Sequence, residues 1–377
     1  MSTKYDLIIV GGGPAGASAL AALRGTGLNI LLLDRAEFPR DKICGDAIPG
    51  HVVRWLRRHA PEMCEELFGL ENKSIIRSST VVASNQARFT VDWKIETFNA
   101  PRLHFDHRLL ELARQRTDHD FRSGTPVESV AETADEVTVR LKNGTTYRAD
   151  YLIAADGANG PCARDLLGLR VDPDHHCAAV RAYFKGVSGV EETTNEVHVL
   201  RDYLPGYFWL FPVGENLVNV GYGMLSRDVS TRKLNLRKLL PEILKMPALR
   251  DRFRGATQLG KVTGFGLPLG TRHHRVHTNR CCLTGDAGSL IDPLYGHGID
   301  KAVISGWLAG EAVRARVAGN DDAFGAYDAE VQRKWAAEFD RSARLRDRVM
   351  QYPDMLDFVV RVASLPIINR LARRIVI

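Results

Sequence analysis

The chain has 377 residues, of which 45% are hydrophobic and 25% are charged, and its formal net charge is +6. These values indicate a globular protein with a large core and two or three domains. No apolar run approaches the roughly 20 residues of a membrane-spanning helix. No aromatic-basic platform indicates a nucleic-acid partner, and the six cysteines show neither Cys-x-x-Cys pairs nor metal-ligand spacing.

The first predicted elements lie in residues 6–34. An apolar strand leads into a Gly-x-Gly-x-x-Gly turn, a small-residue helix and a second apolar strand that ends in an acid. Gly11 allows the tight turn, Gly13 lets backbone N–H groups approach a pyrophosphate, and Gly16 allows close helix–strand contact. The helix N-terminus supplies partial positive charge, and Asp34 is placed to accept hydrogen bonds from a ribose. The pattern predicts dinucleotide binding.

The next segment, residues 38–46, is a loop that reads Phe-Pro-Arg-Asp-Lys-Ile-Cys-Gly-Asp. A thiol in a glycine-containing loop near Arg40 and Lys42 is expected to have a lowered pKa, which would make Cys44 a reactive residue. The alternative is that Cys44 is a small packing residue.

Residues 74–98 and 178–225 are β-rich and alternating, and they predict an antiparallel sheet. On a strand, Tyr207, Trp209 and Phe211 project to one face with period two. Three aromatic side chains on one face form an extended apolar wall with one hydroxyl. That wall is either the lining of a substrate cavity or the inward face of an ordinary core sheet.

Two later stretches repeat the pattern of a strand that breaks into a Gly/Asp turn. One ends in Asp156-Gly157, and the other ends in Gly285-Asp286. The second is followed by Gly296-His297-Gly298 and a predicted helix over residues 299–317, whose N-terminus could face an anionic group. His297 is either a residue that tunes or protonates a cofactor or a structural loop residue.

Together and in this order, the three signatures resemble those of the para-hydroxybenzoate-hydroxylase-like flavoprotein superfamily, over about residues 4–320. The resemblance implies FAD and an α/β fold: a Rossmann-like FAD-binding domain, an inserted antiparallel β-sheet substrate domain and a helical C-terminal segment. It also places Arg108 as an FAD contact, with a solvated helix-start arginine as the alternative. The implied cofactor-binding residues are Gly11, Gly13, Pro14, Ala15, Gly16, Asp34, Arg35, Arg40, Cys44, Gly45, Arg108, Val127, Asp156, Gly157, Gly285, Asp286, Pro293, Gly296, Gly298 and Ile299.

The predicted domains follow from the same signatures. The FAD-binding domain is discontinuous over residues 1–73, 99–177 and 260–325, the substrate-binding domain comprises residues 74–98 and 178–259, and residues 326–377 form the C-terminal helical segment.

Two motifs indicate one family within this superfamily. The Pro-Arg-x-Lys-x-Cys-Gly pattern at residues 39–45 and the Tyr-x-Trp-x-Phe-Pro pattern at residues 207–212 resemble the geranylgeranyl reductase family of FAD-dependent oxidoreductases. This resemblance implies that the first loop lies by the flavin and that Tyr207 and Trp209 line the substrate cavity. The candidate catalytic residues are therefore Cys44, Tyr207, Trp209 and His297. Many family members have Cys-Gly-Gly where this chain has Cys-Gly-Asp, ending in Asp46.

The expected function is reduction of a carbon–carbon double bond in an apolar, isoprenoid-like substrate, by hydride transfer from reduced FAD. NAD(P)H or an electron-donor protein would first reduce the FAD. One alternative is a flavin-dependent monooxygenase or halogenase that uses oxygen, although halogenases typically carry Trp at the position of Tyr207. Another is a non-enzymatic FAD- or lipid-binding protein.

The ends of the chain bear on its location. It opens directly on a predicted strand, so we expect a cytoplasmic protein. Residues 365–377 are apolar on one face and carry three arginines. They form either a helix that contacts a membrane surface or a helix docked on the body of the protein.

Overall fold

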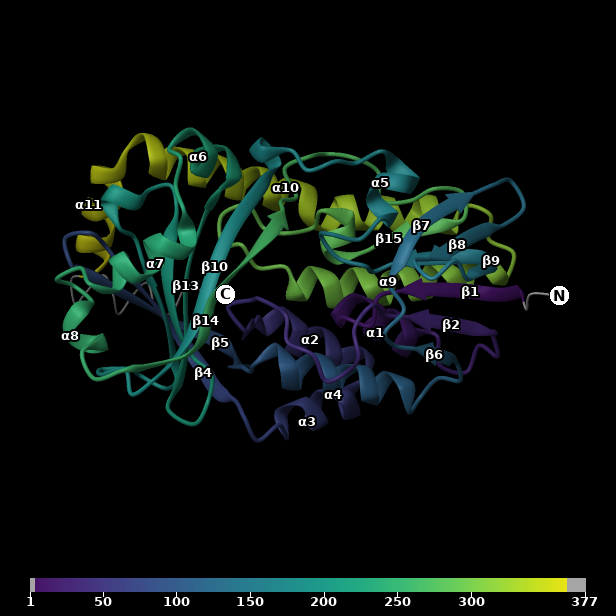
Figure 1. The fold of residues 1–377 in the computed structure, drawn as a ribbon, viewed down its shortest axis with the longest axis horizontal. Coiled ribbons are helices and arrows are strands. Elements are labelled where there is room, and N and C mark those ends of the chain that lie inside the picture. The colour runs from purple at the N-terminus through teal and green to yellow at the C-terminus, as the bar shows by residue number, and fades with distance from the viewer. Residues whose placement is uncertain (1–3, 365–377) are drawn as a thin grey trace. The chain divides into compact units, whose positions relative to one another are not determined.

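The computed structural model describes residues 4–364, which are drawn in colour in Figure 1. They belong to two compact units. Within the described residues, unit 1 comprises residues 4–40, 105–175 and 267–342, and unit 2 comprises residues 41–104, 176–266 and 343–364. The division differs from the predicted domains at residues 41–73, 99–104, 176–177 and 260–266, which cluster with the substrate-side sheet, and at residues 326–342, which cluster with unit 1. A short strand at Ala47–Ile48 explains the difference at residues 41–73, because it pairs with the strand Arg88–Asn99 of that sheet.

Unit 1 contains a sheet with the order β6-β2-β1-β9-β8-β7, and a further strand, β15, pairs with β9. Its strands are β1 (Lys4–Val10), β2 (Ile30–Leu33), β6 (Asp120–Arg122), β7 (Val127–Glu132), β8 (Val137–Leu141), β9 (Thr146–Ala154) and β15 (Cys281–Leu283). β1, β2, β6, β9 and β15 run parallel. The apolar end of β1, residues 7–10, is fully buried, as expected for a parallel strand covered on both faces.

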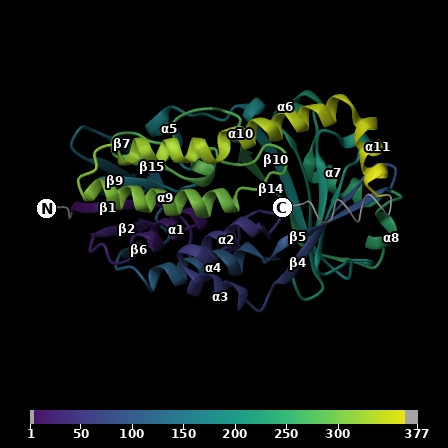
Figure 2. The ribbon, with the colours of Figure 1, turned by 180° about the vertical axis from the view of Figure 1, so that it is seen from behind.

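The helices of unit 1 are α1 (Pro14–Ala22), α5 (Cys162–Leu167), α9 (Ile299–Val317), the 3₁₀ turns η1 (Pro173–His175) and η3 (Gly285–Gly288), and most of α4 (Arg102–Arg114) and α10 (Ala323–Gln351). The predicted bounds of α9 are confirmed. Figure 2 shows α9 beside β9. A Cβ built on Gly306 of α9 would lie 2.1 Å from the backbone oxygen of Ala15 in α1. The two helix backbones are therefore in contact, which the small residues of both helices permit.

Unit 2 contains a sheet with the order β14-β10-β13-β12-β11-β4-β5-β3. Its strands are β3 (Ala47–Ile48), β4 (Ser74–Val82), β5 (Arg88–Asn99), β10 (His176–Lys185), β11 (Thr194–His198), β12 (Tyr207–Pro212), β13 (Leu217–Leu225) and β14 (Thr257–Pro268). β10, β13, β12 and β11 pair antiparallel, as do β4, β5 and β3, whereas β11 and β4 pair in parallel. The predicted antiparallel sheet is confirmed for the pairs named here, except at the parallel junction of β11 and β4.

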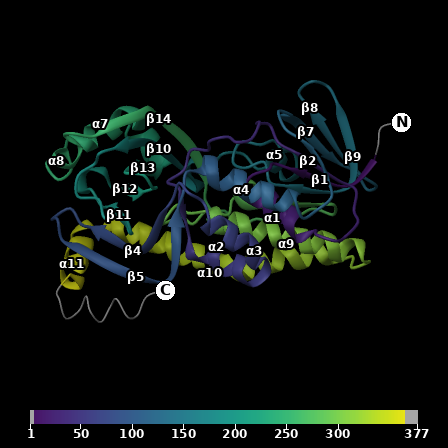
Figure 3. The same cartoon turned by 90° about the horizontal axis from the view of Figure 1, so that it is seen from below.

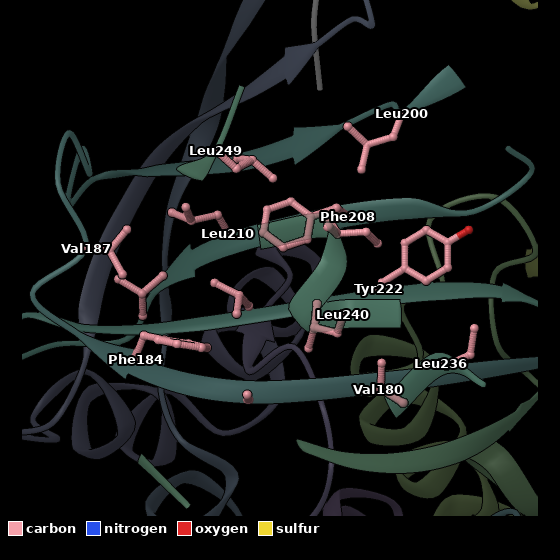
Figure 4. Packing of buried hydrophobic residues seen from close by; sticks show 14 of the residues in the cluster. Val180, Phe184, Val187, Leu200, Phe208, Leu210, Tyr222, Leu236, Leu240 and Leu249 are labelled. Carbon is pink, nitrogen blue, oxygen red and sulfur yellow. The ribbon is translucent and has the colours of Figure 1, made fainter. Parts of the chain in front are cut away.

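One face of this sheet carries the core of unit 2. The helices of the unit are α2 (Gly50–His59), α3 (Pro61–Phe68), α6 (Ser226–Thr231), α7 (Leu236–Leu244), α8 (Arg250–Phe253), α11 (Pro353–Ala363) and the 3₁₀ turn η2 (Arg201–Tyr203). Figure 3 shows α7 beside β10 and β13. Phe208 and Leu210 of β12 pack in one buried cluster with Leu240 of α7 (Figure 4). Since side chains alternate along a strand, the remaining aromatic residues of β12 face the other way.

The described part of the chain contains no helix that is both long and apolar enough to cross a membrane. The C-terminal segment 365–377, for which we left a membrane-surface helix and a docked helix open, lies outside the described residues.

Candidate active site

The three nucleotide-binding signatures meet at one edge of the unit 1 sheet, because β1, β9 and β15 are parallel neighbours and end there. Backbone hydrogen bonds connect the turns that follow the strands. The Ala155 N–H donates to the Val10 oxygen at 2.8 Å, and the Thr284 N–H donates to the Ala154 oxygen at 2.9 Å. In open α/β sheets, ligands bind at this edge, outside the carboxyl ends of the strands.

In the glycine turn after β1, only one of the three motif glycines has room for a Cβ atom or for a ligand. Gly11 has a φ of +108°, and a Cβ there would lie 2.2 Å from the Ala155 oxygen. A Cβ on Gly16 would lie 1.8 Å from the Gly11 oxygen. At Gly13, by contrast, the nearest atom to a built Cβ is a guanidinium nitrogen of Arg40, 3.5 Å away. Gly13 also precedes α1 without a side-chain cap, so the first N–H groups of α1 and this open space fit a diphosphate.

Arg40 supplies positive charge beside this space. Its guanidinium donates to a carboxylate oxygen of Asp106 at 2.6 Å and lies 4.8 Å from the centre of the Phe38 ring. The Asp106 side chain is fully buried. Sequence reasoning missed Asp106, because a single acid in a helix carries no motif, and only the fold brings it to Arg40. A fixed cation at this point is suited to a phosphate oxygen.

Asp34 holds the glycine turn in place. One carboxylate oxygen accepts the Gly12 N–H at 2.6 Å, and the other accepts the Ala36 N–H at 2.8 Å. The predicted hydrogen bond from a ribose hydroxyl to Asp34 would use the remaining lone pairs of the carboxylate and stays a prediction. Arg35, which follows it, is exposed.

The two Gly/Asp turns use their acids differently. Asp156 is half-buried as a residue, one of its oxygens accepts the Cys162 N–H at 2.9 Å, and the burial of its carboxyl raises the pKa of that group. It thereby holds the first turn of α5. Asp286 is half-buried, and one of its oxygens lies 3.5 Å from a Cβ built on Gly298, at the start of α9. The fold thus brings Asp286 to the N-terminus of α9, and its contact with the cofactor stays a prediction.

A cluster of charged side chains lies at the N-terminus of α9. A ring nitrogen of His297 lies 3.1 Å from a carboxylate oxygen of Asp300. The ammonium of Lys301 lies 2.9 Å from Asp300 and 2.9 Å from Glu338. Burial acts to lower the pKa of His297, but the carboxylate of Asp300 outweighs it and raises the pKa. His297 is therefore placed to carry positive charge next to the turn of Gly296 and Gly298. Sequence reasoning missed Asp300 and Lys301.

The structure gives the positions of other residues that were predicted to contact the cofactor, but their contact with the cofactor stays a prediction. Arg108 lies on α4, 3.6 Å from Glu111 of the same helix. Val127 opens β7 and pairs with Leu141 of β8. Cys44 and Gly45 belong to unit 2, and their contact with the cofactor stays a prediction.

In unit 2, the Cys44 loop and the aromatic face of β12 form one assembly. Ring centres of Tyr207 and Trp209 are 6.1 Å apart, and those of Trp209 and Phe211 are 6.3 Å apart, so all three share a face as predicted. A Cβ on Gly45 would lie 3.3 Å from the Phe211 ring and 3.4 Å from the indole nitrogen of Trp209. Trp209 is only 7% exposed, while Tyr207 and Phe211 are half-buried. The accessible part of the wall is therefore formed by Tyr207 and Phe211.

Asn219 of β13 connects the loop to the wall. Its amide oxygen accepts the Trp209 indole N–H at 3.0 Å, and its amide nitrogen donates to the Cys44 carbonyl at 2.7 Å. No sequence spacing indicates this link. The cations expected to act on the Cys44 thiol have other partners: Arg40 pairs with Asp106, and the Lys42 ammonium lies 5.4 Å from the centre of the Phe265 ring.

Known proteins are similar to this chain over most of its length. Residues 4–337 match the FAD binding domain family. A menaquinone reductase of Mycobacterium tuberculosis is 30% identical over 82% of this chain and 77% of its own. A digeranylgeranylglycerophospholipid reductase of Methanopyrus kandleri is 29% identical over 90% of this chain and 84% of its own.

Solved structures share the fold. A geranylgeranyl bacteriochlorophyll reductase-like protein of Thermoplasma acidophilum has a TM-score of 0.83 and 21% identity, over 96% of this chain and 91% of its own. A flavin-dependent brominase has a TM-score of 0.76 and 22% identity, over 96% of this chain and 94% of its own. The chain belongs to the FAD binding domain family, and it is an FAD-dependent oxidoreductase of the geranylgeranyl reductase type.

Proposed function

We propose that the protein reduces a carbon–carbon double bond in an apolar, isoprenoid-like lipid. The observation that carries this proposal is the aromatic face of β12, where Tyr207 and Phe211 are half-buried beside the Cys44 loop. Such a face contacts a lipid chain through apolar area and offers one hydroxyl. The names of two relatives support it, since they are reductases of menaquinone and of a digeranylgeranylglycerophospholipid.

In this proposal the chain binds and orients, and FAD, when bound and reduced, supplies a hydride. The α1 N-terminus and Arg40 hold the diphosphate, and Asp286 holds the ribityl chain. The N-terminus of α9, with His297 beside it, stabilises negative charge on the flavin end of the cofactor. Tyr207 and Phe211 hold an unactivated alkene in a fixed position, which lowers the entropic part of the barrier. NAD(P)H or an electron-donor protein reduces the cofactor beforehand.

The second candidate is a reaction with oxygen, as in a monooxygenase or halogenase. The shared fold of a flavin-dependent brominase favours it. Tyr207 argues against the halogenase, because halogenases typically carry Trp at that position. The earlier alternative of a non-enzymatic FAD- or lipid-binding protein is not retained, because the chain belongs to the reductase type.

A single-turnover experiment separates the two reactions. The bound FAD is photoreduced without oxygen, and the protein is mixed either with geranylgeranyl phospholipids in detergent, or with oxygen, halide and an aromatic acceptor. We expect the lipids to reoxidise the flavin and the product to gain two hydrogens by mass spectrometry. The proposal would be overturned if the lipids did not reoxidise the flavin, while oxygen reoxidised it and gave a hydroxylated or halogenated product.

We also propose that the protein takes its substrate from an anionic membrane surface, through a face of α10 and α11. Met355, Phe358 and Val359 of α11 are 44%, 65% and 52% exposed. Arg344 and Arg348 near the end of α10 are exposed as well. Exposed apolar side chains on a helix favour a lipid surface, and Arg344, Arg348 and Arg361 add cations to this part of the chain, which also carries the exposed acids Asp347 and Asp354.

Sedimentation with vesicles tests this membrane proposal. The protein should sediment with phosphatidylglycerol vesicles and much less with phosphatidylcholine vesicles. Phe358→Asp should abolish sedimentation, whereas Val171→Asp, at an apolar residue of unit 1 that is 67% exposed, should not. Equal sedimentation of both variants would contradict the proposal. It would also be contradicted if light scattering showed that the wild type is a dimer and that Phe358→Asp dissociates this dimer.

A further inference from the structure

Asp46 is a buried acid of the Cys44 loop that the roles above do not use. Its side chain is 0% exposed, and its φ of +65° lies in the left-handed region that few non-glycine residues adopt. Its backbone oxygen accepts the Ala100 N–H at 3.1 Å. The fold therefore holds a carboxyl group in this loop, at a backbone conformation for which glycine is the more common choice.

The two carboxyl oxygens of Asp46 have different surroundings. Oδ2 accepts hydrogen bonds from the Tyr183 hydroxyl at 2.5 Å and from the Asn219 amide nitrogen at 2.8 Å. Oδ1 is buried and has no hydrogen-bond partner among the described residues. A buried carboxylate oxygen without a partner is costly, and a proton on Oδ1 removes most of that cost. The geometry thus favours the neutral acid, with its proton on Oδ1.

The groups that face Asp46 come from three elements. Tyr183 and Arg181 lie on β10, Asn219 on β13 and Arg102 at the start of α4. Burial is the dominant influence and raises the pKa of Asp46 to about 6, while the hydrogen bonds and the two arginine charges act to lower it. Arg181 also pairs with Asp41, whose side chain is about half exposed, and part of its charge is neutralised there.

The acid is linked to the predicted substrate wall by a single side chain. The Asn219 amide nitrogen donates both to Asp46 and to the Cys44 carbonyl, and its amide oxygen accepts the Trp209 indole N–H. Asp46, the Cys44 loop and the aromatic face are therefore one hydrogen-bonded assembly within unit 2.

We propose that the Asp46 carboxyl is the acid that supplies the proton in alkene reduction, an inference that rests on the proposed function. One alkene carbon accepts a hydride, that is, a proton with two electrons, from the reduced cofactor, which ends oxidised. The O–H bond of Asp46 breaks as a C–H bond forms at the other alkene carbon. Asp46 is left as a carboxylate and takes up a proton from solvent before the next turnover.

The pH dependence of a single turnover tests this assignment. In the anaerobically reduced holoenzyme, the rate of reoxidation by the lipid alkene should be level at low pH and fall about tenfold per pH unit above about 6, because only the acid form reacts. Asp46→Asn should lower this rate by at least about 100-fold. Its FAD content, and its reoxidation by ferricyanide, which takes electrons without forming a C–H bond, should be unchanged.

A second variant keeps the test available if Asp46→Asn does not fold. Tyr183→Phe removes a hydrogen bond that lowers the pKa of Asp46, so the fall in rate should move to higher pH. Tyr222→Phe is the matched control, because its hydroxyl donates to the Tyr203 oxygen instead and Tyr222 packs in the core cluster. Its pH profile should equal that of the wild type.

Thermal stability of the FAD-loaded protein gives a readout without turnover. The pKa of Asp46 in the folded protein is above its ordinary value, so its contribution to stability is complete below about pH 4 and is lost as the pH rises through about 6. The melting temperature of Asp46→Asn relative to wild type should therefore rise between pH 4 and pH 7.

The outcomes distinguish the two proposals. A wild-type flavin that no alkene reoxidises overturns the proposed function, and the role of Asp46 falls with it. An active wild type with Asp46→Asn at the same rate, or with a pH profile that Tyr183→Phe does not shift, overturns the role of Asp46 alone. A slow Asp46→Asn variant whose relative melting temperature is the same at every pH shows that Asp46 only holds the loop, which also overturns it.

Discussion

The nucleotide site of unit 1 and the loop–wall assembly of unit 2 are built in different ways. In unit 1, backbone groups and glycines at the ends of neighbouring parallel strands form the site, and each part is a short continuous stretch of sequence. In unit 2, side chains far apart in sequence meet, and Asn219 joins Cys44, Asp46 and Trp209. The first site should therefore be sensitive to any added side chain, and the second to the loss of single hydrogen-bonding groups.

The largest expected effect is at Gly13. Gly13→Val should leave unit 1 folded, because the nearest atom is the end of a flexible arginine at 3.5 Å, but its side chain should fill the diphosphate space and abolish FAD retention. The flavin spectrum after desalting and the far-UV circular dichroism spectrum measure the two effects. Gly255→Val, with nothing within 4 Å, is the control and should keep its FAD. A yellow Gly13→Val protein would show that the diphosphate does not bind there.

A smaller effect on FAD affinity is expected in the same site, and it should differ between Asp286 and Asp156. Asp286→Ala should weaken FAD binding about 10- to 100-fold, as expected for the loss of hydrogen bonds to a charged group worth about 1.5–3 kcal/mol. Asp156→Ala should weaken it less and instead lower the melting temperature, because Asp156 holds the first turn of α5. Titration of both apoproteins with FAD decides the order. Equal or reversed losses would contradict the assignment of Asp286 to the ribityl chain.

In unit 2, Trp209 tests whether the assembly acts through its hydrogen bonds. Trp209→Phe keeps a buried aromatic ring but removes the N–H donated to Asn219, at a cost of about 0.5–1.5 kcal/mol in stability. We expect a modest loss of thermal stability and slower reoxidation by the lipid, with an unchanged affinity for FAD. Tyr207→Phe, which removes a hydroxyl from the same face, is the matched control for the wall. A loss of FAD from Trp209→Phe would mean that the wall is part of a general core.

The smallest effect is expected at Cys44. Cys44→Ala should slow alkene reduction while leaving reduction of the FAD by its donor intact, if the thiol acts on the substrate side. Its loop should stay in place, because Asn219 binds the backbone carbonyl of Cys44 and not the thiol. Stopped-flow measurement of both half-reactions checks this. Wild-type rates in both would establish Cys44 as a packing residue.

The sequence by itself determined the elements whose requirements are local. The Gly-x-Gly-x-x-Gly turn, the two Gly/Asp turns and the bounds of α9 follow from contiguous residues, because turn geometry and helix limits depend on neighbours in the chain. The shared face of Tyr207, Trp209 and Phe211 follows from strand periodicity in the same way. These features give the family and the position of the cofactor site.

Only the tertiary structure decided which distant side chains meet. Asp106 reaches Arg40, and Asn219 reaches Cys44 and Trp209, through the packing of α4 and the register of β12 and β13. Residues 41–73 join unit 2 because β3 pairs with β5. Such contacts depend on how strands align and helices pack across long stretches of chain, and no spacing within either segment encodes them. The burial that raises the pKa of Asp46 arises from the same packing.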